Sequence, residues 1–401
     1  MKHFSMLDPA LSLLQQATTP FGILASINEE TNYRRVWSRD SVICGLAGLV
    51  VQDEQVSEGL KQSIRSLGNH QGPQGQLPSN VQLDEQGRRE SLSFGGLCGR
   101  VDTISWWAIG LCQYLHFHPD EQLKADMAPV LDKGFGLLDA WEFNDKGLVY
   151  VPQSGNWADE YLLRGYILFD QLLRVLALKC AAAIYQRSDW HQKADRIKGL
   201  LQKNYWITDH SSSDLYHQHA FELAAAQSGP SRYWEASFGP GGYIRYFDLL
   251  ANALALLLKL PTSEQTEQLL AYTDVVADQM PYGLMPSFWE PILPGQPDWS
   301  LLQANYKYHF RNQPYEFQNG GIWPVFNGWW GLALVQAGKT ARAQKILEGL
   351  RQANQLGNNG FYECLHGQNG QVHGTRQCTW SAAGQLLLQA ALEGKSLWVP
   401  S

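Results

Sequence analysis

Apolar residues recur at three- and four-residue steps through most of this 401-residue chain, which is the spacing of a buried face on an α-helix. The pattern predicts twelve helices, and no run of residues alternates convincingly as a strand would. We expect the helices at about residues 9–18, 40–52, 53–69, 102–117, 123–141, 160–186, 190–205, 246–259, 263–279, 322–337, 339–353 and 379–393.

The connections between the predicted helices alternate between short turns and long loops. The chain turns back within a few residues after each even-numbered helix, but each odd-numbered helix after the first is followed by a long loop, at about 70–101, 142–159, 206–245, 280–321 and 354–378. Loops of that length in a compact domain are usually functional. Helices that alternate in direction would bring all long loops to one face. We therefore predict an all-α (α/α)6 barrel, with an open helical solenoid as the alternative, although no repeat of fixed period is present.

The chain reads as a single domain, residues 1–401, because no Pro/Ser-rich linker or charge run divides it. The N-terminus lacks the uninterrupted apolar core of a signal peptide, and the longest apolar run, residues 249–260, is too short to span a bilayer. We expect a cytoplasmic protein. Six scattered cysteines without a CxxC pair fit free thiols in a reducing compartment: Cys44, Cys98, Cys112, Cys180, Cys364 and Cys378.

The composition narrows the class of partner. A net charge of −7 gives no reason to expect nucleic acid or an anionic membrane as a partner. The chain is 12% aromatic, with 15 Trp and 17 Tyr, which suits stacking on neutral hydroxylated ligands or simply a large core. Composition alone leaves these two interpretations open.

Polar and aromatic clusters precede the even-numbered helices. N-capping explains an acidic residue at a helix start, but it requires no neighbouring Trp and Arg. The clusters are residues 37–40, 99–102, 156–160, 245, 319–321 and 379–380. Six of them converging on one pocket would form a site.

The chain lacks the known signatures of cofactor and metal sites. It contains no P-loop, dinucleotide fingerprint or HExxH, and His217 and His219 with Asp214 match no established metal site. We expect no cofactor and no metal. Carboxylates beside Trp and Arg, without a Ser or Cys nucleophile motif, indicate glycoside chemistry, in which one carboxylic acid protonates the leaving oxygen and a carboxylate activates water or attacks the sugar. The expected partner is a small carbohydrate.

Five segments, in order, resemble the alkaline/neutral invertases of plants and cyanobacteria and, more distantly, the trehalases and related glucosidases. The quoted segments are Asn32-Tyr-Arg-Arg-Val-Trp-Ser-Arg-Asp40, Gly99-Arg-Val-Asp-Thr-Ile-Ser-Trp-Trp107, Ser154-Gly-Asn-Trp-Ala-Asp159, Tyr315-Glu-Phe-Gln-Asn-Gly-Gly-Ile-Trp-Pro324 and Phe361-Tyr-Glu-Cys-Leu-His-Gly367 with Gln377-Cys-Thr-Trp-Ser-Ala-Ala-Gly384. The resemblance independently implies an (α/α)6 barrel. One departure is Glu160-Tyr161, where the invertases have Arg-Arg, so sucrose is not implied.

The resemblance implies roles for two carboxylates. Asp159 matches the general acid of the SGxD-type segment that opens the third inner helix, and Glu363 matches the general base of the late aromatic-Glu segment. A helix N-terminus lowers the pKa of an Asp, so burial would have to oppose that effect at Asp159. We expect the substrate-binding residues to be Trp37, Arg39, Asp40, Asp102, Trp157, Glu160, Glu290, Glu316, Gln318, Asn319, Trp323 and Trp380.

The leading hypothesis is an inverting glycoside hydrolase that cleaves a short α-linked glucoside, such as sucrose, another disaccharide or a glucosyl conjugate. One alternative is a sugar epimerase or isomerase on the same barrel, which would use pocket histidines from among His70, His309, His366 and His373. Another is a carbohydrate-binding protein without catalysis. The sequence predicts neither the leaving-group sugar nor the oligomeric state.

Overall fold

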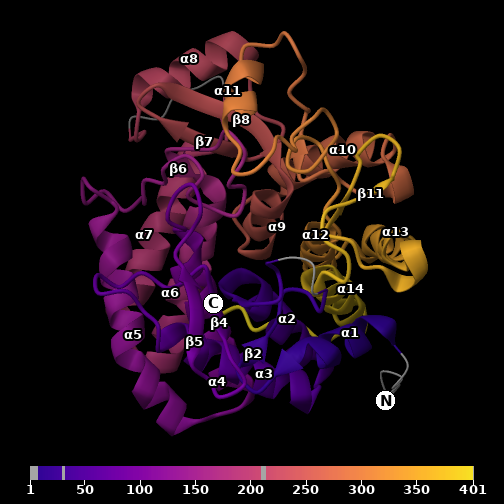
Figure 1. The fold of residues 1–401 in the computed structure, drawn as a ribbon. Helices are drawn as coiled ribbons and strands as arrows, with labels where there is room; N and C mark the ends of the chain where they lie inside the picture. Colours follow the sequence, from indigo (N-terminus) through magenta and orange to yellow (C-terminus); the bar gives the residue numbers. More distant parts are fainter. Residues whose placement is uncertain (1–7, 29–31, 209–213, 401) are drawn as a thin grey trace.

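Six helices form a closed inner ring in the computed structural model, which describes residues 8–28, 32–208 and 214–400. Each of these helices packs against the next, and the last packs against the first (Figure 1). They are α2 (Ser38–Val51), α4 (Asp102–Phe117), α6 (Leu168–Tyr185), α9 (Leu249–Leu257), α12 (Pro324–Gln336) and α14 (Thr379–Leu392). The contact between α14 and α2 closes the ring and excludes the open solenoid.

Outer helices surround this ring. They are α1 (Pro9–Ala17), α3 (Glu54–Gly68), α5 (Glu121–Ala140), α7 (Ser188–Asn204), α10 (Ser263–Ala277) and α13 (Thr340–Asn359). The inner helices are buried on nearly all sides, as in the wholly buried α9, because apolar and small residues cover every face of them. The outer helices have one buried face and one exposed face. The predicted (α/α)6 barrel is confirmed.

Close contact between inner helices depends on glycine. A Cβ atom at Gly328 in α12 would lie 2.2 Å from the carbonyl oxygen of Gly384 in α14, which is far inside van der Waals contact. The two helix backbones therefore touch, and neither position has room for a side chain. This approach places the N-terminal ends of α12 and α14 side by side.

The long loops contain short elements that hydrophobic periodicity did not predict. Two helices, α8 (Gln218–Ser228) and α11 (Trp299–Ala304), and the 3-10 turn η1 (Pro281–Gly283) lie within them. Four small antiparallel sheets also occur in the segments between the helices of the two rings. They are β1 (Thr18–Thr19) with β2 (Gly22–Ile23); β3 (Val36–Trp37), β4 (Asn80–Leu83) and β5 (Arg89–Ser93); β6 (Tyr166–Ile167), β7 (Glu235–Gly239), β8 (Gly242–Asp248) and β9 (Phe288–Trp289); and β10 (Cys364–Leu365) with β11 (Val372–His373). The expectation of no strands was wrong, because strands of two to seven residues are too short to alternate visibly.

The third inner helix begins later than its sequence pattern predicts. We expected a helix over residues 160–186, but α6 begins at Leu168. The preceding residues, Tyr166 and Ile167, form β6 and pair with β7, and Gly165 has a positive φ of 88°. Because the sheet uses these backbone groups, Asp159 and Glu160 lie in an irregular segment and not at a helix N-terminus.

The C-terminal segment packs against α4 at the end of the ring away from the long loops. Near the C-terminal end of α4, the side-chain amide of Gln113 donates to the carbonyl of Trp398 at 2.5 Å, and the Trp398 indole stacks on His116 with 4.3 Å between ring centroids. Leu397 is buried beside them. The last residues of the described chain therefore pack against the second inner helix.

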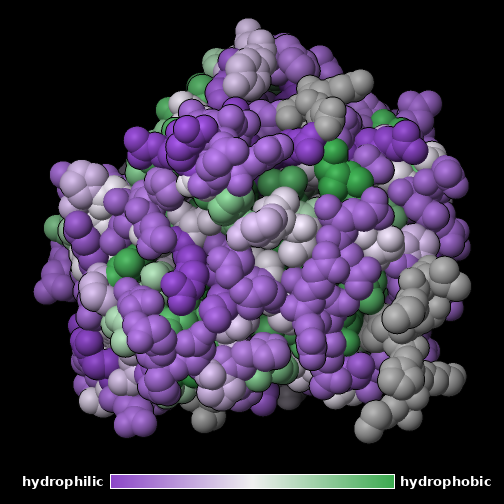
Figure 2. All heavy atoms as spheres, turned by 60° about the horizontal axis from the view of Figure 1, so that its bottom comes forward, coloured by the Kyte–Doolittle hydropathy of each residue, from purple (hydrophilic) through white to green (hydrophobic). Residues whose placement is uncertain are grey.

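The molecular surface is mainly polar on the face shown in Figure 2, where hydrophobic residues occupy small separate areas. Within the described ranges, none of the helices has both the length and the apolar character that a membrane span requires.

Candidate active site

A cavity of about 380 Å³ lies among the long loops, at the N-terminal ends of the inner helices. Its walls come from the loops that precede α2, α4, α6, α12 and α14, and from the first turns of α2 and α14. The described residues of the loop before α9 do not line it. The expected cluster at Arg245 lies elsewhere, because Arg245 is in β8 and pairs with Glu235 at 2.8 Å.

Ten of the fourteen residues singled out from the sequence line this cavity. They are Trp37, Arg39, Asp40, Trp157, Asp159, Glu160, Gln318, Trp323, Glu363 and Trp380. The aromatic members form a connected floor, in which Trp323 lies edge-on to Trp380 and to Trp157, with ring centroids 5.6 and 5.4 Å apart. A sugar ring placed here would meet indole faces on one side and carboxylates on the other.

Two of the four remaining residues are buried behind the cavity wall. Asp102 is only 1% exposed and accepts two hydrogen bonds from Arg39, at 2.9 and 2.7 Å, so it holds a guanidinium that does line the cavity. Asn319 is fully buried, and its side-chain amide bonds to the backbone of Ile292 and Asn312. Asp102 therefore supports a wall residue, whereas Asn319 holds backbone behind the wall, and neither side chain lines the cavity.

Glu290 and Glu316 also lie outside the cavity wall. Glu290 is exposed on the surface, and Glu316 lines a different cavity. The structure thus brings Asp159 and Glu363 together with eight of the twelve expected binding residues.

Glu363 is held rigidly at the base of the β10–β11 hairpin. Its Oε1 accepts from the Tyr33 hydroxyl at 2.5 Å, and its Oε2 accepts from the backbone N–H of Thr375 at 3.1 Å. Gly374 makes this fit possible, because a Cβ atom there would lie 2.4 Å from Oε2. Burial raises the pKa of Glu363 above its ordinary value, although the Tyr33 hydrogen bond and the Arg311 charge oppose the rise.

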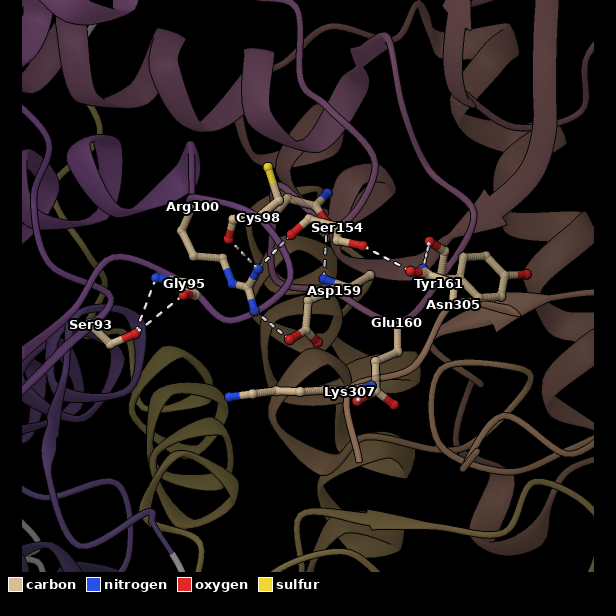
Figure 3. A network of polar contacts seen from close by, with 12 residues as sticks. Ser93, Gly95, Cys98, Arg100, Ser154, Asp159, Glu160, Tyr161, Asn305 and Lys307 are labelled. Carbon is tan, nitrogen blue, oxygen red and sulfur yellow. Dashed lines mark hydrogen bonds and ion pairs between the residues drawn. The ribbon is translucent and has the colours of Figure 1, made fainter. Parts of the chain in front are cut away.

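Asp159 is held differently. Its side chain is 23% exposed, and its Oδ2 forms an ion pair with the guanidinium of Arg100. Arg100 also donates to the carbonyl of Ser154 at 2.5 Å and to that of Cys98 at 3.2 Å, which fixes its direction (Figure 3). A single arginine therefore sets the position of Asp159.

Glu160 points from the same segment to a loop that the motifs did not identify. Its carboxylate, 2% exposed, accepts hydrogen bonds from Arg311 at 3.0 and 3.2 Å. It also accepts one from the backbone N–H of Lys307 at 3.4 Å (Figure 3). Asn305 strengthens the connection by donating to the Tyr161 carbonyl and accepting from the Ser154 hydroxyl. Residues 305–312 are thus fixed to the segment that contains Asp159.

Asp40 is a further carboxylate of the cavity wall. Burial raises its pKa to about 7, against the lowering effect of the neighbouring Arg39. Near neutral pH its carboxyl group is therefore a donor as well as an acceptor, which suits a sugar hydroxyl.

The sequence motifs did not single out several residues of the cavity wall. Tyr33 and Arg100 stand inside quoted motifs and were available from them, but only the three-dimensional contact with a carboxylate distinguishes them from their neighbours. Lys307, Tyr308 and Arg311 lie in an irregular loop without periodicity, so no local signal identifies them.

The described part of the chain contains neither a cluster of metal ligands nor a histidine in the cavity wall. No three His, Cys, Asp or Glu side chains there are placed to hold a metal ion. None of the described histidines lines the cavity, and His309 and His373 line a second one. The described cavity wall thus offers an epimerase no histidine acid or base.

Comparison with known proteins gives a consistent result. A family model described as the mannosylglycerate hydrolase MGH1-like glycoside hydrolase domain matches residues 167–381. The chloroplastic alkaline/neutral invertase E of Arabidopsis thaliana is 22% identical over 86% of this chain and 65% of its own length. The probable alkaline/neutral invertase D of the same plant is 23% identical over 96% of this chain and 81% of its own. The chain thus spans slightly less than two thirds of the chloroplastic relative.

Solved structures show the same fold. The GH63 mannosylglycerate hydrolase from Thermus thermophilus, in complex with Tris and D-glycerate, has a TM-score of 0.67 at 14% identity and covers 96% of this chain and 99% of its own. A bacterial glucoamylase complexed with acarbose has a TM-score of 0.63 at 17% identity, over 97% of this chain and 55% of the glucoamylase. The resemblance inferred from the motifs is confirmed.

Proposed function

Because the chain belongs to the mannosylglycerate hydrolase MGH1-like family and is therefore a glycoside hydrolase, we propose that it cleaves a short α-linked glucoside with inversion at the anomeric carbon. Asp159 would protonate the glycosidic oxygen, and Glu363 would deprotonate the attacking water. The observation that supports this best is that both carboxylates line one cavity, from the loops before the third and the sixth helices of a six-helix ring.

Glu363 has the surroundings of a general base. The Tyr33 hydroxyl and the Thr375 N–H both donate to it, and such bonds favour the carboxylate form that accepts a proton. Its pKa is nevertheless raised by burial, which makes the carboxylate a stronger base than one in water. Tyr33 remains a donor, because burial and the Glu363 charge raise its own pKa well above the ordinary value.

The acid role of Asp159 requires a change on substrate binding. In the free protein its carboxylate is paired with Arg100, whereas a general acid must present a proton to the leaving oxygen. We propose that the substrate separates Asp159 from Arg100 and that Asp159 is protonated in the complex. The partial exposure of Asp159 is consistent with such a movement, since one side of the carboxylate faces the cavity.

The deep part of the cavity suits the glycosyl ring. The indole rings of Trp157 and Trp380 line the cavity and offer apolar surface to a sugar ring. Arg39 and Asp40 add a donor and a group that can donate or accept. A pyranose with several equatorial hydroxyls, such as glucose, fits this set.

The cavity wall contains two cationic side chains, Lys307 and Arg35. Neither forms an ion pair with a described carboxylate. We propose that an anionic leaving group such as glycerate is accepted at least as well as a neutral sugar. A Lys307→Met variant should then raise KM for glucosylglycerate more than for sucrose.

The experiment is hydrolysis of sucrose, trehalose, kojibiose, glucosylglycerate and mannosylglycerate by purified protein, with NMR of the sugar anomer first released. Release of the β-anomer from at least one α-linked substrate supports the proposal. Release of the α-anomer would contradict inversion, and no turnover of any substrate would contradict the proposed substrate class. The exposed Glu290→Gln variant is the matched control for the catalytic substitutions discussed below.

A further inference from the structure

Glu363 forms part of the wall between two cavities. A second cavity of about 800 Å³ is lined by His309, Glu316, His373 and Gly374, among others. Arg311, Phe317, Glu363 and Thr375 line this cavity as well as the first one. Asp159 lines the first cavity only, so the second cavity lies on the Glu363 side of the site.

Inversion requires water on that side. The attacking water approaches the anomeric carbon from the face opposite the leaving group, next to the general base. A sugar that fills the first cavity, with its leaving group toward Asp159, would separate this position from the mouth of the first cavity. A path from the Glu363 side would let water reach this position after the sugar has bound.

We propose that the second cavity supplies the attacking water to Glu363 while the sugar occupies the first cavity; this inference rests on the proposed hydrolase function. The step forms a bond between the water oxygen and the anomeric carbon as the glycosidic bond breaks. One proton of the water passes to Glu363, and the leaving oxygen takes a proton from Asp159.

The walls of the second cavity suit water. His309 and Arg376 are exposed and His373 is half-buried, so polar groups connect the cavity with solvent. Gly374 lies directly at Glu363, where a Cβ atom would come within 2.4 Å of Oε2. Both Gly374 and Glu363 line the second cavity, so the carboxylate meets this cavity beside a residue without a side chain.

The test uses two separate variants, His373→Trp and His309→Trp, each of which places a larger side chain in the second cavity. Neither histidine lines the first cavity, so the sugar site stays unchanged. Val372→Trp is the matched control, because Val372 is the neighbouring residue in β11, is 38% exposed and lines neither cavity. His373→Ala and His309→Ala remove the imidazoles without filling the space. The substrates are α-D-glucosyl fluoride and α-D-mannosyl fluoride, whose small leaving group makes the result independent of the natural leaving group.

The expected result is a fall in kcat of about ten-fold for each tryptophan variant of a cavity histidine, with glucose binding by calorimetry unchanged. Val372→Trp and both alanine variants should keep the kcat of the unmodified protein. Unchanged kcat in His373→Trp and His309→Trp would overturn the water path while leaving the hydrolase function intact. Equal losses in the alanine variants, or in Val372→Trp, would also overturn it. An unmodified protein that hydrolyses neither the fluorides nor the glycoside panel would refute the proposed function, and the water path with it.

Discussion

The two carboxylates of the cavity have opposite surroundings. Glu363 is 2% exposed, and both of its oxygens accept hydrogen bonds, one from the Tyr33 hydroxyl and one from the Thr375 N–H. Asp159 is partly exposed, lies in an irregular segment and is held by Arg100. One carboxylate is therefore fixed in place, while the other can change partner.

This difference fits the division of labour in an inverting reaction. A base must hold one water molecule in a precise position, whereas an acid must follow a leaving oxygen that differs between substrates. The rigid wall at Glu363 and the adjustable pair at Asp159 would then allow one enzyme to accept several leaving groups. The following predictions test that contrast.

Glu363→Gln should cause the largest loss. Without a base, kcat should fall by about 10³-fold or more on both a natural glycoside and α-D-glucosyl fluoride, because both reactions need an activated water. Steady-state kinetics with the two substrates measure this, with Glu290→Gln as the control. A loss of kcat confined to the natural glycoside would mean that Glu363 acts as the acid instead of the base.

Asp159→Asn should affect the two substrates unequally. On the natural glycoside, kcat should fall by about 10³-fold, because the leaving oxygen is no longer protonated. Fluoride leaves without a proton, so the loss on α-D-glucosyl fluoride should stay below about ten-fold. Equal losses on both substrates would show that Asp159 does not act as the acid.

Tyr33→Phe should change the pH profile. The Tyr33 hydrogen bond lowers the pKa of Glu363, so its removal raises that pKa, and Glu363 becomes an active base only at higher pH. The acidic limb of the pH profile of kcat/KM should therefore move to higher pH. At a pH below the optimum, kcat/KM should fall by about ten-fold. Tyr306→Phe, outside the cavity, should leave the limb unchanged. A Tyr33→Phe profile that matches the unmodified protein would show that the hydroxyl has no influence on the base.

Arg100→Lys should have the smallest effect. Lysine keeps the charge beside Asp159 but cannot also reach the Ser154 and Cys98 carbonyls, so kcat/KM should fall by only about three-fold. Kinetics on the natural glycoside measure this. A loss as large as that of Asp159→Asn would mean that Asp159 needs the same rigid support as Glu363.

The sequence predicted the ring well, because a helical period and the alternation of loop lengths are properties of the chain itself. The start of α6 was wrong, because the pairing of β6 with β7 joins residues about 70 positions apart and overrides the local helical pattern. The same limit applies to the strands, which are too short to produce a period.

The site was partly predictable for a related reason. Residues within the motifs, such as Trp37 and Glu363, do line the cavity. The motif residues Asp102 and Asn319 do not, because a motif identifies a position in the chain but not the direction of its side chain. Arg311 and Lys307 come from a loop whose place is fixed by Glu160, and only the folded chain shows that contact.

The packing of the C-terminal segment on α4 affects how the barrel comes apart. In an open array of repeats, a terminal repeat has one neighbour and can fray alone. Here α14 contacts α2, and the Trp398 segment contacts α4, so every inner helix has a neighbour on both sides. Loss of any single hairpin exposes two apolar faces instead of one, so native-state hydrogen exchange should show the six inner helices opening together.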